Sequence, residues 1–202
     1  MFGKKKLTSD VVVDEECKIK ILSSRLTEFN QVFSLYVQVK NVKDINWEAY
    51  YNRCLRLLSY APDLVYMVDE NGKNIIEYML LINEMSLFLD LLKESEQKGG
   101  AGIKNLLVCK YGQKEPLCFS VLQSSQVEDI VKMDNYIKEY DCDPINASKQ
   151  KWSKLTKQKM KSIEENENEN RNIFNSRIKP ILESLRNVQQ ENQRKDIGER
   201  KQ

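Results

Sequence analysis

Cysteine, carboxylate and glycine-rich stretches are the parts of this 202-residue chain whose residue types could do chemistry. The chain has no histidine, which excludes Ser-His-Asp and Cys-His catalysis, histidine-ligated zinc and histidine pH switching. Cys118 follows Pro116-Leu117 on a segment expected to be buried, so we interpret it as a small hydrophobe rather than a nucleophile. Gly99-Gly-Ala-Gly102 could cradle a phosphate, but no Gly-Lys-Ser/Thr follows it, and we interpret it as a flexible linker.

Two acidic stretches could hold a cation. Residues 69–73 imitate the start of a calcium loop, but Gly72 is the fourth residue of that stretch, where a calcium loop has glycine at the sixth. The alternating acids of Glu139–Asp143 lie close together, but Pro144 follows at once and calcium-loop spacing is absent. We therefore interpret both as turns, and the sequence predicts no catalytic site, no metal and no cofactor.

The cysteine count bears on the compartment. Five cysteines are present, an odd number with no C-x-x-C pair. They stand at Cys17, Cys54, Cys109, Cys118 and Cys142. A disulfide framework is not expected, which favours the cytoplasm or another reducing compartment. The basic start Met-Phe-Gly-Lys-Lys-Lys is followed by no apolar stretch of signal-peptide length, and no apolar run is long enough to span a bilayer.

Composition and charge divide the chain. The hydrophobic fraction of 41% allows a modest core and is well above the fraction found in disordered chains. Residues 147–202 hold 14 Lys and Arg against 8 Asp and Glu, whereas residues 1–146 hold 18 against 22. The sequence therefore predicts a flexible segment over 1–13, a mildly acidic helical domain over 14–146 and a basic, charged helical tail over 147–202.

Apolar periodicity predicts helices throughout the domain. Residues 15–39 carry apolar side chains every three or four positions, with an early break at Ser23-Ser24. Asp44 is the expected N-cap of a helix over 46–59, which Pro62 stops. A unit of polar turn, short helix, tight break and longer helix then occurs twice. We expect it at 69–72, 74–82 and 85–96, and again around Gly112, at 116–123 and at 127–139.

These units resemble ankyrin repeats. The stretch from Asp69 to Leu80, followed by Leu87–Leu92, is similar to a consensus of D-x-x-G-x-T-P-L-H-x-A-A, a break and I-V-x-L-L-L. Leu57–Val65 resembles the end of an earlier repeat, Glu115-Pro116-Leu117 resembles the T-P-L core, and Tyr140–Asn146 resembles the exit of a later one. The resemblance covers residues 44–146. It implies a short all-α solenoid of about three degenerate helix pairs, with an N-terminal capping helix and the helical tail.

The departures from the consensus are plain. Asn74 and Glu115 occupy the threonine slot, and Glu77 and Cys118 replace the histidine. Ile75 and Pro116 are 41 residues apart, compared with the usual repeat length of about 33. An unrelated all-α bundle is the alternative.

The resemblance also implies a protein-binding function through the turn tips. The candidate contacts are Asp69, Asn71, Lys73, Tyr111, Gln113 and Lys114. The alternative for each is a turn that only reverses the chain. A Lys-, Asn-, Glu- and Ile-rich composition suits an A/T-rich genome, as in intracellular bacteria whose ankyrin-like proteins meet host factors, and delivery into a host cell is left open.

The tail offers a second candidate surface. Residues 149–161 contain six lysines and no acid, with Trp152 among them. Lysines there could contact phosphates or an acidic protein, and Trp152 could stack. The tail-binding candidates are Lys151, Trp152, Lys154, Lys157 and Lys161. The alternative, which we favour, is a solvated helix whose Trp152 caps the last repeat.

Farther along, an apolar stripe of Phe174, Ile178, Ile181, Leu185 and Val188 is coiled-coil-like but lasts barely two heptads. Pro180 should kink or restart the helix, and the short stripe needs a partner surface. We expect it to fold back on the 149–165 helix as an antiparallel hairpin. The alternatives are packing on the repeat body and contact with another chain, which would make a tail-mediated oligomer. The sequence thus predicts a non-enzymatic protein-interaction scaffold. The alternatives are a nucleic-acid-binding protein using 149–161 and an enzyme with a carboxylate pair, for which the sequence singles out no candidate pair.

Overall fold

The predicted all-helical class is confirmed for the described part of the chain. A computed structural model describes residues 7–140, 143–183 and 186. Its regular elements are α1 (Leu7–Val39), α2 (Trp47–Tyr60), the 3₁₀ helix η1 (Pro62–Tyr66), α3 (Ile75–Leu81), α4 (Met85–Gln97), α5 (Ile103–Leu106), the 3₁₀ helix η2 (Leu117–Gln123), α6 (Val127–Lys138), α7 (Asp143–Ile173) and the π-helical turn η3 (Phe174–Ile178). Within these residues, no helix is both long and apolar enough to cross a membrane.

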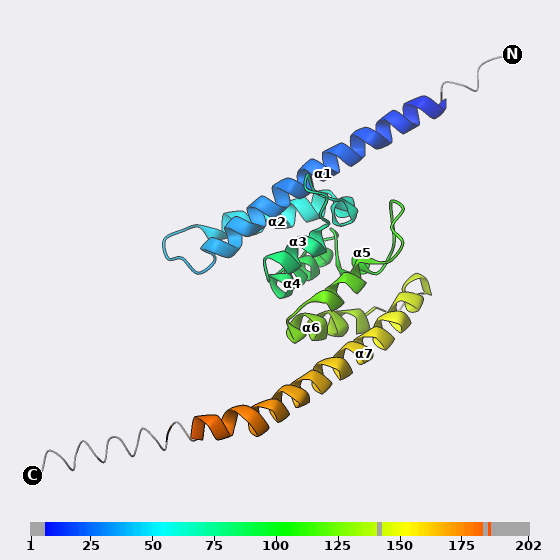
Figure 1. Cartoon of the computed structure of the whole chain (residues 1–202). Coiled ribbons are helices and arrows are strands. Elements are labelled where there is room, and N and C mark those ends of the chain that lie inside the picture. The colour runs from blue at the N-terminus through cyan, green and yellow to red at the C-terminus, as the bar shows by residue number, and fades with distance from the viewer. Residues whose placement is uncertain (1–6, 141–142, 184–185, 187–202) are drawn as a thin grey trace, which may run out of the picture. The chain divides into compact units, whose positions relative to one another are not determined.

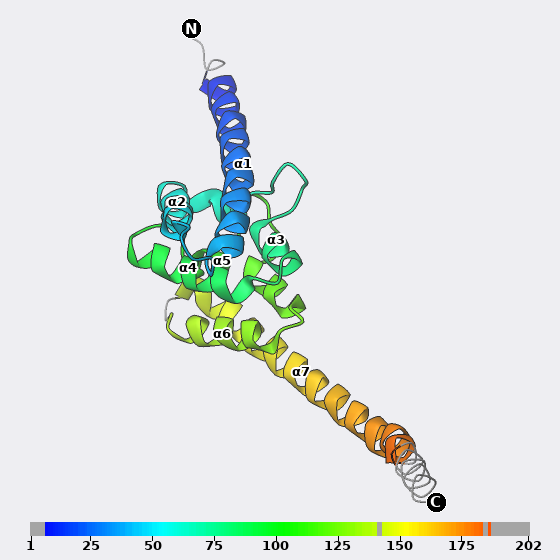
Figure 2. The same ribbon diagram turned by 90° about the vertical axis from the view of Figure 1, so that its left-hand side faces the viewer.

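The chain divides into two compact units, Met1–Thr156 and Lys157–Gln202. In the first unit the longer helices contact one another in chain order, α2 against α4 and α4 against α6. A second series of contacts joins α1 to α3 and α3 to η2. Figures 1 and 2 show α3 and α4 lying between the α1–α2 pair and α6. The two turn-and-helix units found in the sequence are therefore neighbours in space.

Large apolar side chains join these layers. Phe29 and Phe33 of α1 are fully buried, and each packs in a T-shaped arrangement with Phe88 of α4, with ring centroids 6.1 and 6.4 Å apart. Between α4 and α6 the contact is also polar. Asp90, which interrupts the leucine run of α4, accepts hydrogen bonds from Tyr136 Oη at 2.7 Å and Lys132 Nζ at 2.6 Å. Asp90 thus joins α4 to α6 through side-chain hydrogen bonds.

Helix α1 is longer and more regular than expected. It begins at Leu7, within the segment 1–13 that we expected to be flexible, and it runs without a break through Ser23 and Ser24. The Ser23 hydroxyl donates to the backbone carbonyl of Val68, so it does not interrupt the helix. The predicted N-cap was also wrong, because Asn46 precedes α2 and Asp44 lies in the left-handed region at φ +70°.

The glycine-rich loop is packed, and the prediction of a flexible linker at Gly99–Gly102 is wrong. Gly100 N–H donates to Ser95 O at 2.9 Å, and Ala101 N–H donates to Leu58 O of α2 at 3.0 Å. Ala101 is fully buried, and the following residues form the short helix α5. Sequence periodicity missed this because the loop owes its order to contacts with α2, which lies far away in the chain.

A substitution at Gly100 tests this packing. A Cβ at Gly100 would lie 2.6 Å from Ser59 Cα and 2.5 Å from Ser95 Oγ, whereas one at Gly99 would meet nothing within 4 Å. We expect Gly100→Ala to lower the free energy of unfolding by about 3 kcal/mol, the upper end of the range for overpacking, because one of the close atoms belongs to the backbone. Gly99→Ala should cost about 1–2 kcal/mol, from its left-handed φ of +79° alone. Urea unfolding measures both, and equal costs would contradict the packing described.

The tail begins as part of the first compact unit. Helix α7 runs unbroken from Asp143 to Ile173, so the predicted hairpin in which the stripe folds back on residues 149–165 is wrong. The predicted domain boundary at 146/147 falls inside this helix. Trp152 is 1% exposed and its Nε1–H donates to Asp134 Oδ1 of α6 at 3.0 Å. Burial of this one large side chain extends the body to about residue 156.

In the second unit the helix changes character just before Pro180. The π-helical turn η3 ends there, with Lys179 N–H donating to Phe174 O. Proline has no N–H for the carbonyl four residues earlier, which accounts for the widened turn. Phe174, Ile178 and Ile181 of the apolar stripe are exposed, while Leu185 and Val188 lie outside the described residues.

Candidate functional site

The first polar turn is organised by Asp69. Its Oδ1 accepts the backbone N–H groups of Asn71 at 2.8 Å and Lys73 at 3.0 Å, and Gly72 takes the positive φ of +74° that such a turn requires. Asp69 is 7% exposed, and its Oδ2 accepts Asn30 Nδ2 of α1 at 3.3 Å. The role of Asp69 is thus to build the turn, and its carboxylate faces the protein rather than a partner.

The end of this turn starts α3. Asn74 is the N-cap: its Oδ1 accepts Glu77 N–H at 3.0 Å, and Glu77 Oε2 accepts Asn74 N–H at 2.8 Å. This reciprocal capping box satisfies two backbone donors that a helix start leaves unpaired. Val68 forms a bridge with Asn74 across the turn. Asn71 is exposed and Lys73 half-buried at the turn itself.

The second polar turn is held by Asp63 of η1. Tyr111 and Gly112 both have positive φ, +52° and +75°. Asp63 accepts hydrogen bonds from Tyr111 Oη at 2.7 Å and from Lys110 Nζ at 2.9 Å. The ring of Tyr66 contacts both donors, with its centroid 6.3 Å from that of Tyr111 and 5.2 Å from Lys110 Nζ. Aromatic and charged contacts therefore fix a turn whose own backbone is unfavourable for non-glycine residues.

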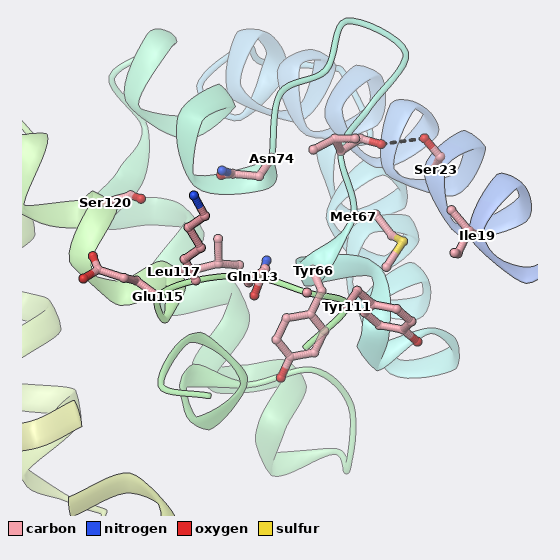
Figure 3. A pocket seen from close by; sticks show the side chains of 13 residues that line it. Ile19, Ser23, Tyr66, Met67, Asn74, Tyr111, Gln113, Glu115, Leu117 and Ser120 are labelled. Atoms are coloured by element: carbon pink, nitrogen blue, oxygen red, sulfur yellow. Dashed lines mark hydrogen bonds between the residues drawn. The ribbon is translucent and has the colours of Figure 1, made fainter. Parts of the chain in front are cut away.

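A groove of about 560 Å³ lies between the two turns and α1. Figure 3 shows Ile19 and Ser23 of α1 on one side of it and Gln113, Glu115 and Leu117 on the other, with the Glu115 carboxylate turned away from α1. It is lined by Ile19, Ser23, Tyr66, Met67, Val68, Asn74, Tyr111, Gly112, Gln113, Lys114, Glu115, Leu117 and Ser120. Its size is that of an ordinary ligand pocket.

The structure brings together half of the predicted turn contacts. Tyr111, Gln113 and Lys114 line the groove, whereas Asn71 and Lys73 do not, and Asp69 is buried beneath its turn. Sequence reasoning missed the contributions of α1 and of the segment after η1. No local signal marks Ile19, because its place at the groove depends on how α1 packs against a turn about fifty residues later.

The electrostatics of Asp63 make the second turn sensitive to acid. Burial opposes ionisation of this carboxyl, but hydrogen bonds from Lys110 and Tyr111 outweigh it and hold its pKa below the ordinary value. A carboxyl with a depressed folded-state pKa stabilises the fold above its unfolded pKa, which is about 3.9 for Asp. That contribution is lost as the pH falls through the folded-state pKa.

Asp63→Asn tests this contribution. At neutral pH we expect a loss of about 1–2 kcal/mol in the free energy of unfolding, the range for charge-assisted hydrogen bonds that stay partly solvated. The difference from the parent chain should shrink as the pH is lowered below about 4. Urea unfolding across this pH range measures it, with Glu70→Gln, an exposed carboxylate of the first turn, as the control. A difference that does not depend on pH would contradict the role given to Asp63.

The basic tail residues are placed differently from one another. Trp152 is buried, as the capping alternative predicted, so it does not present its ring to a partner. Lys151 pairs with Glu115 at the groove edge, and its Nζ lies 4.8 Å from the Phe119 ring centroid. Lys161 lies 3.6 Å from Glu165. Lys154 and Lys157 are exposed, so the predicted cluster does not form one surface of free cations.

The remaining chemical candidates are structural. Cys118 is fully buried, and burial raises the pKa of its thiol to about 12, so the reactive thiolate is disfavoured. Cys54 behaves in the same way. Across the residues that the structure describes, no group of three or more His, Cys, Asp or Glu side chains could hold a metal ion. Asp141, one of the alternating acids considered above, lies outside those residues.

No protein-family model matches this sequence, and neither does any curated protein or solved structure. The described part defines an all-helical protein with an open groove. The chemistry of that groove is the basis for its function.

Proposed function

We propose that the chain is a non-enzymatic scaffold of degenerate ankyrin-like helix pairs that binds another protein through the groove between its two polar turns. The observation that carries this proposal is the arrangement of the two units. Each has a turn, a short helix and a longer helix, and the short and long helices of one unit contact their counterparts in the other. A row of such pairs, extended by α1 and α2, is a solenoid.

The lining of the groove supports binding rather than catalysis. Its polar groups are amides, hydroxyls, one lysine and one glutamate that is already paired with Lys151. The chain has no histidine, which excludes Ser-His and Cys-His pairs, and the raised pKa of the buried Cys118 thiol disfavours its reactive thiolate. Exposed apolar side chains at the groove, Ile19, Val68 and Tyr111, are typical of a contact surface.

Nucleic-acid binding through 149–161 has less support. Trp152 cannot stack on a base while it is buried, and Lys151 is paired with Glu115. If this segment did bind phosphates, its affinity for RNA or DNA would fall steeply as the salt concentration rises.

A quantitative pull-down with matched variants tests the proposal. The full chain is compared with a Gln113→Glu/Lys114→Glu double variant of the groove and with Lys154→Glu/Lys157→Glu on α7. Lys104→Glu, on the exposed side of α5, is the control for charge alone. We expect the groove variant to lose a partner protein that the other two retain. Loss with the α7 variant instead, together with salt-sensitive binding of RNA or DNA, would contradict the proposal.

A further inference from the structure

The walls of the groove are apolar and its size is limited. Ile19 comes from α1, Met67 and Val68 follow η1, and Leu117 begins η2. Ile19 and Val68 are 41% and 50% exposed, which is high for aliphatic side chains beside a core. A volume of about 560 Å³ accommodates a few side chains. An α-helix about 10–12 Å across is a poor fit for such a space, so a short segment is the better match.

Two amides on the walls can donate hydrogen bonds to a ligand. Asn74 Oδ1 accepts Glu77 N–H as the helix cap, which identifies the oxygen and leaves both N–H groups of the amide without a partner in that cap. Gln113 Oε1 makes a long contact of 3.5 Å with Lys110 N–H, and its Nε2 is a second amide donor. These amino groups complement a ligand that accepts hydrogen bonds.

The charged residues at the groove also favour a ligand that accepts hydrogen bonds. Lys114 lines it, while the neighbouring carboxylate of Glu115 is compensated by Lys151. At the adjoining edge Asp63 faces two lysines, Lys110 at 2.9 Å and Lys18 at 3.5 Å. Lys114 forms no ion pair among the described residues, so the uncompensated charge on the lining of the groove is positive. A carboxylate is the natural complement.

We propose that the occupant of the groove is a short segment of a partner protein in which Asp or Glu stands beside an apolar side chain. The proposal rests on the function proposed above and gives the chemistry of the partner. The carboxylate accepts from Lys114 and the two amides, and the apolar side chain packs between Ile19 and Leu117. The chain's own acidic run, residues 164–169, lies within helix α7 and so is not the short non-helical segment that the size of the groove favours.

A peptide library displayed on phage tests the specificity directly. The full chain is the bait, and the Gln113→Glu/Lys114→Glu variant is used to remove peptides that do not depend on the groove. We expect enrichment of sequences that place Asp or Glu next to Leu, Ile, Val or Phe. Enrichment of basic peptides, of acidic peptides without an apolar neighbour, or of peptides that the double variant also retains would overturn the proposal.

The most enriched peptide, labelled with fluorescein, is used to measure how much each substitution weakens binding. By fluorescence anisotropy we expect Lys114→Glu and Gln113→Glu each to weaken binding about tenfold, as for loss of one charge-assisted hydrogen bond, and Lys104→Glu to leave it unchanged. Equal weakening by Lys104→Glu would show a nonspecific charge effect and overturn the proposal. If no peptide is enriched while the pull-down still depends on the groove variant, the partner chemistry is wrong and the scaffold function stands. If the pull-down is also independent of that variant, both proposals fail.

Discussion

Leu91→Asp is expected to abolish cooperative folding of the helical body. Leu91 is 1% exposed on α4, the helix that contacts both α2 and α6. Truncating a buried leucine costs about 2–5 kcal/mol, and leaving a carboxylate without a partner in the same place adds several more. The sum is comparable to the whole stability of an ordinary domain, about 5–15 kcal/mol. The loss should therefore be visible without denaturant.

The matched control is Leu81→Asp at the end of α3. Leu81 is 62% exposed, so the same substitution should change the free energy of unfolding by no more than about 1 kcal/mol. Circular dichroism on heating measures both variants. A cooperative transition with full helical signal in Leu91→Asp would show that α4 is not at the centre of the core.

Trp152→Ala is expected to have the next largest effect, a loss of about 3–5 kcal/mol, because it removes a large buried side chain. Trp152→Phe should cost less, since it keeps an aromatic ring and removes the hydrogen bond to Asp134. The large value is expected because the start of α7 packs against α6 and covers the last helix pair. Without that closure, apolar surface of the last helix pair is exposed.

The chain provides its own control in Trp47, which is 37% exposed at the start of α2. Urea unfolding followed by circular dichroism should show a smaller cost for Trp47→Ala. The tryptophan fluorescence that remains in Trp47→Ala should be blue-shifted, because it comes from the buried Trp152. Equal costs, or red-shifted emission from Trp152, would contradict the capping role.

Local sequence pattern was sufficient to predict some helices and loops but not others. The helices expected at 74–82, 85–96 and 127–139 agree closely with α3, α4 and α6, because capping and apolar spacing act over a few residues. Local reasoning failed at the glycine-rich loop and at Ser23-Ser24. In both places the segment donates a hydrogen bond to a backbone carbonyl that is distant in sequence, that of Leu58 or of Val68.

The residues that line the groove could likewise be predicted only in part. The sequence marked the two turns, since their Asp and Gly residues have strong local preferences. It could not show that Asp69 is buried under Asn30 or that Ile19 completes the groove, because both depend on the packing of α1. The orientation of the Asn74 amide also needed coordinates, since only the capping contact shows which of its two terminal atoms is the oxygen.

Site-specific photo-crosslinking tests the central claim most directly. A benzophenone amino acid replaces Gln113 in the groove, and in a second protein it replaces Asn52 on the exposed side of α2, and the full-length chains are irradiated in the cells that produce them naturally. A groove that binds a partner protein predicts a discrete protein adduct from position 113 that is absent from position 52. The same adducts from both positions, or adducts with nucleic acid alone, would contradict it.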